Sequence, residues 1–374
     1  MIETKPPQAT NLFDLIGREW ALEGAVTGLT FNAGTSAVAC AMEDGTLTML
    51  PVADSEHPEK RIRMDLETGR TTIRPREGAL PHPQRTERLR PGAALCALGG
   101  QGFAVAGEGA SLWRVTARGQ TVRLARDGVA PVSALCSVGT ERICVARDGH
   151  LSLMDAEDMT LLANCALPLP VERLEASADG MLIVAWSPER FTILKAGTLA
   201  VLAVIAAPGQ VNSLAWSRDR RWIAAGCEDK SLVLVDVLRG LADRIVDFPA
   251  PVMSAGFNAE AEALVASGAF RVVGWRLPDL PFGDHEGDPI RSGRAGLTIV
   301  ERVAPNPVRD TCAVGYASGL VTLCPLGGRD ELMLREGAGA PVTALDWSGD
   351  GTHLAIGFAD GRAGIVTFPK VMFK

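Results

Sequence analysis

The stretch from Val211 to Val237 reads VNSLAWSRDRRWIAAGCEDKSLVLVDV, and the stretch from Val342 to Phe368 reads VTALDWSGDGTHLAIGFADGRAGIVTF. Both begin with an alternating apolar segment, which a polar turn joins to a segment of small apolar residues. A tight turn then leads into a third apolar segment. Alternation of apolar and polar residues predicts a half-buried β-strand, and residues such as Gly, Asp and Ser form the turns between strands. Each stretch therefore predicts three short antiparallel strands.

The same pattern recurs along nearly the whole chain. The copies begin at Val26, Ala93, Val132, Val171, Val211, Val252, Leu297 and Val342. Successive copies start about 40 residues apart, except that an insertion lengthens the first interval. A fourth strand fits the variable segment before the next copy, for example residues 198–206. Four short antiparallel strands at this period are typical of one blade of a β-propeller.

The pattern resembles the WD40 repeat family, most closely in the copies that begin at Val211 and Val342. The family's Gly-His pair is absent, and no Trp-Asp dipeptide closes any copy. The resemblance implies an all-β fold, a closed propeller of four-stranded antiparallel blades. It also implies a non-catalytic scaffold or adaptor that displays a rigid face to other proteins.

Eight visible copies favour eight blades, with seven as the alternative because seven is the commoner number in the resembled family. The last copy contains only three strands, and residues 18–24 look like a separate fourth strand that could complete it. We therefore expect the N-terminal strand to close the ring and remove the open sheet edge. Residues 1–374 would form a single propeller domain, with an N-terminal tail (1–16), a basic insertion loop (68–92) and an acidic, Gly- and Pro-rich insertion (278–295).

The first insertion is the main irregularity of the chain. Residues 60–90 carry nine basic and four acidic side chains. Residues 60–66 could supply the fourth strand of the first blade, and the rest reads as a long polar loop. A basic loop on an acidic ring could contact an acidic partner, although a solvated insertion is the alternative. The candidate partner-binding residues are Arg70, Arg74, Arg76, Arg85, Arg88 and Arg90 in this loop, and Glu172, Arg173 and Asn212 where inner strands begin.

Composition narrows the class of protein. The net charge of −7 and the lack of aromatic residues in the basic loop make nucleic acid an unlikely partner. The chain has no apolar stretch long enough to span a membrane, and its first residues do not resemble a secretory signal. Its eight cysteines form no Cys-x-x-Cys pair, which suits a reducing compartment, and we expect a cytoplasmic location. The scarcity of Lys relative to Arg suits a GC-rich bacterial genome.

Enzymatic signatures are missing from the sequence. There is no Gly-x-Ser-x-Gly elbow and no phosphate-binding loop that leads into a helix. We therefore predict no catalytic, cofactor-binding or metal-binding residue and no cofactor. The alternative function is a small-ligand binder or an enzyme that uses the central channel of the propeller. A permanent subunit of a larger complex is a third possibility, and large exposed apolar patches would favour it.

Repeat equivalence predicts which large side chains are buried. Trp216 and Trp347 share the same position of the first strand, so we expect both to pack between neighbouring blades. Trp113 and Trp275 share a third-strand position and are also predicted to be in the core, whereas Trp20 and Trp186 lack such partners and are predicted to be exposed. Four cysteines occupy shared positions and are predicted to be small core residues: Cys40, Cys96, Cys136 and Cys144.

Overall fold

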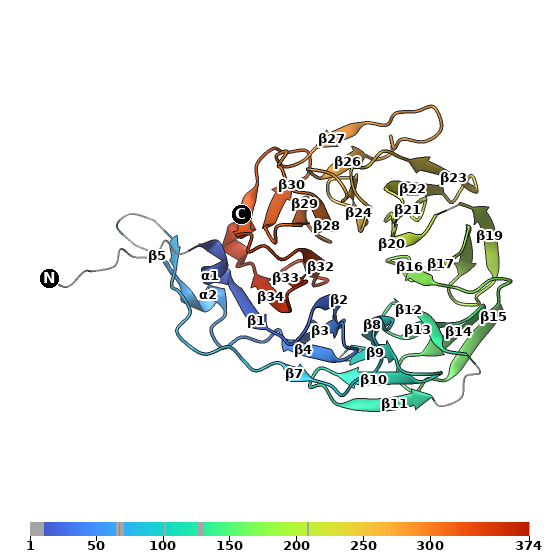
Figure 1. Ribbon diagram of the computed structural model, residues 1–374, viewed down its shortest axis with the longest axis horizontal. Helices are drawn as coiled ribbons and strands as arrows, with labels where there is room; N and C mark the ends of the chain where they lie inside the picture. Colours follow the sequence, from blue (N-terminus) through green and yellow to red (C-terminus); the bar gives the residue numbers. More distant parts are fainter. Residues whose placement is uncertain are drawn as a thin grey trace.

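The computed structural model describes residues 11–64, 67, 71–100, 102–125, 130–207 and 209–373. These residues form eight four-stranded antiparallel sheets that surround a central channel as the blades of a propeller (Figure 1). The predicted fold class and the favoured number of eight blades are confirmed, and the alternative of seven blades is wrong. No helix in the described ranges has the length and apolar character needed to cross a bilayer.

The blades are numbered in chain order, and the strands of each run from the channel outward. Blades 1 to 4 contain β2 (Val26–Phe31), β3 (Ala37–Met42), β4 (Leu47–Pro51) and β7 (Gln84–Arg85); β8 (Leu95–Leu98), β9 (Gly102–Ala106), β10 (Leu112–Thr116) and β11 (Thr121–Ala125); β12 (Val132–Val138), β13 (Arg142–Arg147), β14 (His150–Asp155) and β15 (Leu161–Ala166); and β16 (Arg173–Ala176), β17 (Leu182–Ser187), β18 (Arg190–Lys195) and β19 (Val201–Ala206).

Blades 5 to 8 repeat this arrangement. They contain β20 (Val211–Trp216), β21 (Trp222–Cys227), β22 (Ser231–Asp236) and β23 (Leu241–Ile245); β24 (Ala255–Asn258), β25 (Ala263–Ala266), β26 (Val273–Arg276) and β27 (Pro289–Arg291); β28 (Val300–Pro305), β29 (Thr311–Tyr316), β30 (Val321–Pro325) and β31 (Leu332–Arg335); and β32 (Val342–Trp347), β33 (His353–Phe358), β34 (Arg362–Thr367) and β1 (Gly17–Ala21). The remaining elements are the helices α1 (Leu12–Ile16) and α2 (Pro58–Arg61), the strands β5 (Ile62–Met64) and β6 (Thr71–Ile73), and the 3-10 helix η1 (Lys370–Phe373).

The ring is closed by its two chain ends. β1 pairs with β34 from Gly17 opposite Val366 to Ala21 opposite Arg362, as the sequence predicted (Figure 1). Arg335 of blade 7 donates from Nε to Glu19 Oε2 at 2.6 Å and ties the closing strand to the neighbouring blade. The structure differs from the predicted N-terminal tail at residues 12–16, which form α1. Residues 1–10 of that tail lie outside the described residues.

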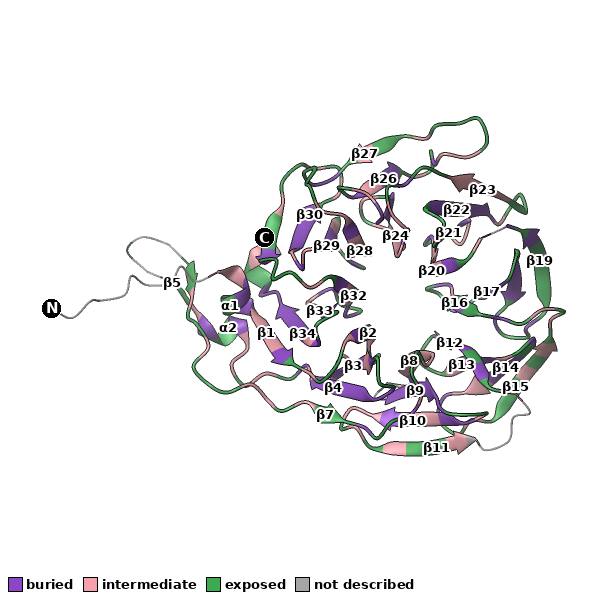
Figure 2. Ribbon diagram, viewed as in Figure 1, coloured by how far each residue is buried: buried purple, intermediate pink, exposed green. Residues whose placement is uncertain are grey.

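The core lies between adjacent blades, where the two middle strands of most sheets are largely buried (Figure 2). Trp347 donates from its indole N–H to the Ala304 carbonyl of blade 7 at 2.8 Å. Trp216 donates in the same way to the backbone carbonyl of Glu175 in blade 4 at 3.1 Å. The predicted packing of these tryptophans between blades is therefore confirmed. The four cysteines predicted to be core residues are buried as well.

Two tryptophans predicted to be exposed are instead buried. Trp20 is 6% exposed because residues 80–81 cover it, and its indole N–H donates to the Pro81 carbonyl at 2.9 Å. Trp186 is 3% exposed because it packs on the neighbouring blade 5. Repeat comparison missed both, since their burial depends on contacts particular to one blade.

The outer strand of blade 1 is β7 and not residues 60–66, so that prediction is wrong. Pro58 starts the short helix α2, and the following β5 pairs with β6 as a separate two-stranded hairpin beside the ring (Figure 1). β7 pairs with β4, and Thr86 Oγ1 accepts from the Leu47 N–H at 3.0 Å. The second insertion differs in the same way, because its residues 289–291 form β27, the outer strand of blade 6.

Candidate functional site

The inner strands of all eight blades run in the same direction along the channel. The face of the ring at which they begin is called the start face here. Glu172 and Arg173 lie there at the beginning of β16, and both are exposed. Arg173 donates from Nε to the Val211 carbonyl of blade 5 at 3.4 Å, next to Asn212. Asn212 donates from Nδ2 to Glu228 Oε2 at 3.0 Å. The structure therefore brings together the three candidates predicted at the starts of inner strands.

A cavity of about 400 Å³ opens beside these residues. The inner strands of blades 1 to 4 line it, and its charged lining residues are Glu172, Arg173 and Glu175. Glu175 faces the open channel, but the ring walls surround its carboxyl group. This burial raises the pKa of Glu175 to about 7, and repulsion from Asp346 adds to the effect. The carboxyl group therefore changes charge near neutral pH.

Asp346 is the equivalent residue in blade 8, four blades away around the ring. Burial raises the pKa of Asp346 to about 6, although its carboxylate accepts a hydrogen bond from the Phe31 N–H at 3.1 Å. The sequence analysis did not identify Glu175 or Asp346. Alignment of the repeats would have found them, because both precede by one residue the position that Trp216 and Trp347 occupy.

A second pair of equivalent residues adds positive charge to the channel walls. Blades 4 and 7 share the tripeptide Val-Glu-Arg, which places Arg173 and Arg302 at the same position of their inner strands. Arg302 donates from Nε to the Thr343 carbonyl of blade 8 at 2.6 Å. Burial lowers the pKa of Arg302. The channel thus carries basic side chains beside two carboxyl groups with raised pKa values.

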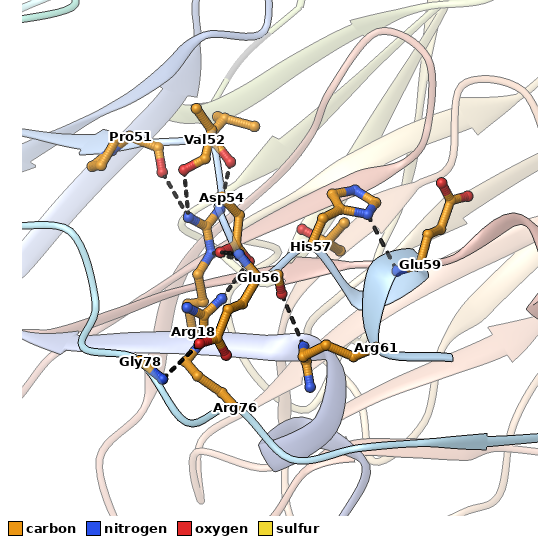
Figure 3. A network of polar contacts seen from close by, with 12 residues as sticks. Arg18, Pro51, Val52, Asp54, Glu56, His57, Glu59, Arg61, Arg76 and Gly78 are labelled. Atoms are coloured by element: carbon orange, nitrogen blue, oxygen red, sulfur yellow. Dashed lines mark hydrogen bonds and ion pairs between the residues drawn. The ribbon is translucent and has the colours of Figure 1, made fainter. Parts of the chain in front are cut away.

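The basic insertion is anchored to the ring by buried ion pairs. Asp54, whose side chain is 3% exposed, pairs with Arg76 and lies 3.9 Å from Arg18 (Figure 3). Burial by itself would raise the pKa of Asp54, but hydrogen bonds from Arg76 and from the Glu56 N–H, together with the Arg18 charge, hold it below its ordinary value. Arg61 is also buried and donates from Nε to the Glu56 carbonyl at 2.9 Å. Arg76 therefore positions the insertion in this structure.

The candidate arginines of the insertion do not share one face of the ring. Arg76 pairs with Asp54, which follows the end of β4 on the face opposite the start face. Arg85 forms ion pairs with Glu23 and Asp44, and Asp44 lies in the β3–β4 turn on the start face. The segment runs across the rim from one face to the other because it must lead to β7 and then into blade 2.

The remaining insertion candidates divide into anchored and exposed side chains. Arg90 is half-buried and donates from Nη1 to the Val132 carbonyl at the start of β12, at 2.9 Å. Arg74 and Arg88 are exposed, and no hydrogen bond or ion pair with the described residues engages their guanidinium groups. Arg70 lies outside the described residues. Arg88 is adjacent to Leu89, whose N–H donates to the Gly45 carbonyl in the β3–β4 turn of the start face at 2.8 Å.

Two further observations bear on the chemistry that is available. Within the described ranges, no three His, Cys, Asp or Glu side chains lie close enough together to hold a metal ion. A larger cleft of about 1040 Å³ lies between blades 2 and 3 on the face opposite the start face. Arg114 crosses this cleft and donates to the Glu157 carbonyl at 2.8 Å. The sequence analysis did not predict the cleft, because it forms between two repeats.

Comparison with known proteins supports the architecture. The family model described as WD domain, G-beta repeat matches residues 200–236 and 331–365. Each match covers the outer strand of one blade, β19 or β31, and the first three strands of the next, blade 5 or blade 8. The fold is similar to the crystal structure of the computationally designed Ika8 protein, with a TM-score of 0.65 and 16% identity over 93% of this chain and 98% of that chain. A search of curated proteins found no match. Proteins with WD40 propellers commonly act as interaction scaffolds and are generally non-catalytic. This chain is thus an eight-bladed β-propeller in a closed ring, and two of its segments match the WD40 repeat model.

Proposed function

We propose that this propeller is a non-catalytic adaptor that binds a protein partner through its start face. The observation that carries the proposal is the exposure of Glu172 and Arg88 on that face. Neither side chain forms a hydrogen bond or ion pair with the described residues, so neither has a structural role there. Charged side chains on a rigid backbone favour a specific partner, because the backbone loses little conformational freedom when the partner binds.

The contact would combine charges of both signs. Glu172 and Arg173 are consecutive, and Asn212 of the next blade adds an amide group beside them. Arg88 would extend this surface toward the rim, and Arg85 and Arg90 would hold the insertion in place. A partner of complementary charge would then bind with an affinity that falls as salt concentration rises.

The β5–β6 hairpin is proposed as a separate contact for an acidic partner. It projects beside the ring (Figure 1), and the exposed Arg74 directly follows β6. Arg70 is a candidate from the sequence alone. Arg76 would position this hairpin through Asp54. We also propose that the protein is cytoplasmic, does not insert into a membrane and belongs to a larger complex. The eight unpaired cysteines are consistent with a reducing compartment.

Affinity capture from the native cell extract, followed by mass spectrometry, tests this function. Wild type is compared with Glu172→Ala/Arg173→Ala and with the control Glu141→Ala/Lys195→Ala. The control also removes one acid and one base from exposed positions, but these lie on the opposite face. We expect a stoichiometric partner that wild type and the control retain and the first variant loses. Equal capture by all three proteins would exclude the start face as the contact.

A second candidate function is the binding of a small cationic ligand in the central channel. The raised pKa values of Glu175 and Asp346 favour it, because a cation between two carboxyl groups would relieve their repulsion. The test is calorimetric titration of wild type and Glu175→Gln with small polyamines at pH 8. Binding to wild type that the variant abolishes would support a ligand site, and no heat from either protein would exclude this class of ligand.

A further inference from the structure

The outer strands of the blades differ in how they avoid pairing with other chains. An outer strand leaves one row of backbone N–H and C=O groups unpaired, and natural proteins protect such edges with charged residues, prolines or short strands. Charged residues occur in six of the eight outer strands: β1, β7, β11, β23, β27 and β31. The outer strands without a charged residue are β15, which reads LLANCA, and β19, which reads VLAVIA. They lie in the neighbouring blades 3 and 4.

Among the outer strands, β19 has the largest number of exposed large apolar side chains. Val201, Leu202 and Val204 are 45%, 57% and 56% exposed, and the strand is exposed along most of its length (Figure 2). Leu161 and Leu162 of β15 are 52% and 49% exposed. These five side chains lie on the outer strands of two adjacent blades and are called the rim patch here. Large apolar side chains exposed in one region of a folded protein favour an interaction site there.

The pairing of β19 within its own sheet defines what can cover it. β19 is the last strand of its sheet and pairs with β18 from Arg190 opposite Ala206 to Leu194 opposite Val201. Its other edge can accept one more strand. That strand would extend the sheet of blade 4 and would satisfy the unpaired backbone groups of the edge. The occupant is therefore an extended segment with apolar side chains.

We propose that this occupant is β19 of a second copy of the chain, paired antiparallel about a two-fold axis. Two-fold contacts place the same surface on itself, so like charges in an edge strand would face like charges. All six residues of β19 are apolar, so every antiparallel register of the pair brings apolar residues together without charge repulsion. The charged outer strands do not meet this condition. Two four-stranded blades would then form one eight-stranded sheet, with the rim patch of each copy beside the junction.

Two valines of nearly equal exposure provide a matched test. Val204 lies in β19 and Val122 lies in β11, an outer strand that already contains Arg123; their exposures are 56% and 53%. We would measure the mass of full-length wild type, Val204→Lys and Val122→Lys by light scattering after gel filtration, from low to high micromolar concentration. A lysine tolerates either position because both side chains face solvent, so loss of fold is not expected.

The proposal predicts that wild type and Val122→Lys have twice the monomer mass at high concentration and that Val204→Lys has the monomer mass throughout. Hydrogen exchange of the amides in 201–206 should also slow as the wild-type concentration rises. A wild type with the monomer mass at every concentration would overturn the proposal. This holds even if β19 pairs with a different protein. A Val204→Lys protein that still dimerises would overturn it as well.

Discussion

Glu175 in blade 4 and Asp346 in blade 8 occupy the same position of their repeats, and their carboxyl groups repel each other across the central channel. Both belong to inner strands, β16 and β32, and both pKa values are raised mainly by burial. The repeat that builds the ring therefore also places two carboxyl groups with raised pKa values in its channel. This relationship connects the fold to the pH dependence of its stability.

The first prediction concerns that pH dependence. A carboxyl group with a raised native pKa binds its proton more tightly in the folded state, so its contribution to stability is full at low pH and is lost as the pH rises through the native value. For Glu175 this loss falls between the ordinary value of 4.5 and about 7, and for Asp346 between 3.8 and about 6. Glu175→Gln removes one of these groups. Water in the open channel screens the charge of Glu175 and so reduces its destabilising effect. We therefore expect the variant to melt only about 2 °C above wild type at pH 8.

Thermal unfolding at pH 5 and pH 8 measures this prediction. The difference between Glu175→Gln and wild type should shrink at pH 5, where wild-type Glu175 is largely protonated. Glu141→Gln, at an exposed turn, is the control and should follow wild type at both pH values. A variant that is no more stable than wild type at pH 8 would show that burial does not perturb Glu175.

The second prediction concerns the buried ion pairs of the insertion. Asp54→Ala leaves Arg18 and Arg76 without their carboxylate partner inside the protein. Removing one member of a buried pair costs about 3–5 kcal/mol of unfolding free energy. Because the native pKa of Asp54 lies below its ordinary value of 3.8, its contribution is present at neutral pH and is lost as the pH falls through the native value. Urea unfolding at pH 7 provides the measurement.

The pair of Arg362 and Asp360, which is more exposed than Asp54 and its partners, serves as the control for this prediction. Its members are 24% and 37% exposed, and Asp360→Ala should cost less than about 1 kcal/mol. Trypsin should also cut Asp54→Ala faster than wild type in the hairpin residues 60–76. Equal unfolding costs for the two aspartate variants would mean that the insertion is not anchored through Asp54.

The third prediction separates packing from hydrogen bonding at a blade interface. Trp347 is 7% exposed and donates to the Ala304 carbonyl. Trp347→Ala should cost about 3–5 kcal/mol, because it leaves a cavity between blades 7 and 8. Trp347→Phe keeps most of the packing but leaves a buried carbonyl without a donor, so it should cost about 1–3 kcal/mol. Chemical unfolding measures both free energies. An equal loss of unfolding free energy in Trp347→Phe and Trp347→Ala would contradict this account.

The fourth prediction tests ring closure. A chain that lacks residues 1–21 loses β1, so β34 becomes an unprotected edge of blade 8. We expect a lower melting temperature and aggregation on heating, which light scattering would detect. A synthetic peptide of residues 11–24 should restore part of the stability when it is added to the shortened chain. An equally stable shortened chain would show that β1 does not contribute to closure.

The repeat pattern was sufficient to predict the ring, the eight blades and the closing strand. The copies at Val211 and Val342 have the full alternation of apolar residues and turns, and local sequence determines such strands strongly. The prediction failed for residues 60–66, because a short strand can pair with either of two neighbours and the sequence does not say which. β7 contains only two residues, too few for a periodic signal.

The candidate site residues were also predicted only in part. Glu172, Arg173 and Asn212 were predicted from their position at strand starts, and the structure places them together on the start face. The roles of Arg76 and Arg85 could not be read from the sequence, because their partners Asp54 and Asp44 lie more than twenty residues away and become neighbours only when the insertion folds across the rim. Trp20 was missed for a similar reason, since residues of the insertion cover it.

The most direct test of the central claim is the affinity of the captured partner for the purified propeller as a function of salt. Isothermal titration would compare wild type, Glu172→Ala/Arg173→Ala and the control Glu141→Ala/Lys195→Ala at low and high ionic strength. We predict that the wild-type and control affinities fall about tenfold or more between 50 and 300 mM salt, and that the start-face variant binds weakly at both. Affinities that are the same for all three proteins and do not respond to salt would contradict a charged contact on the start face.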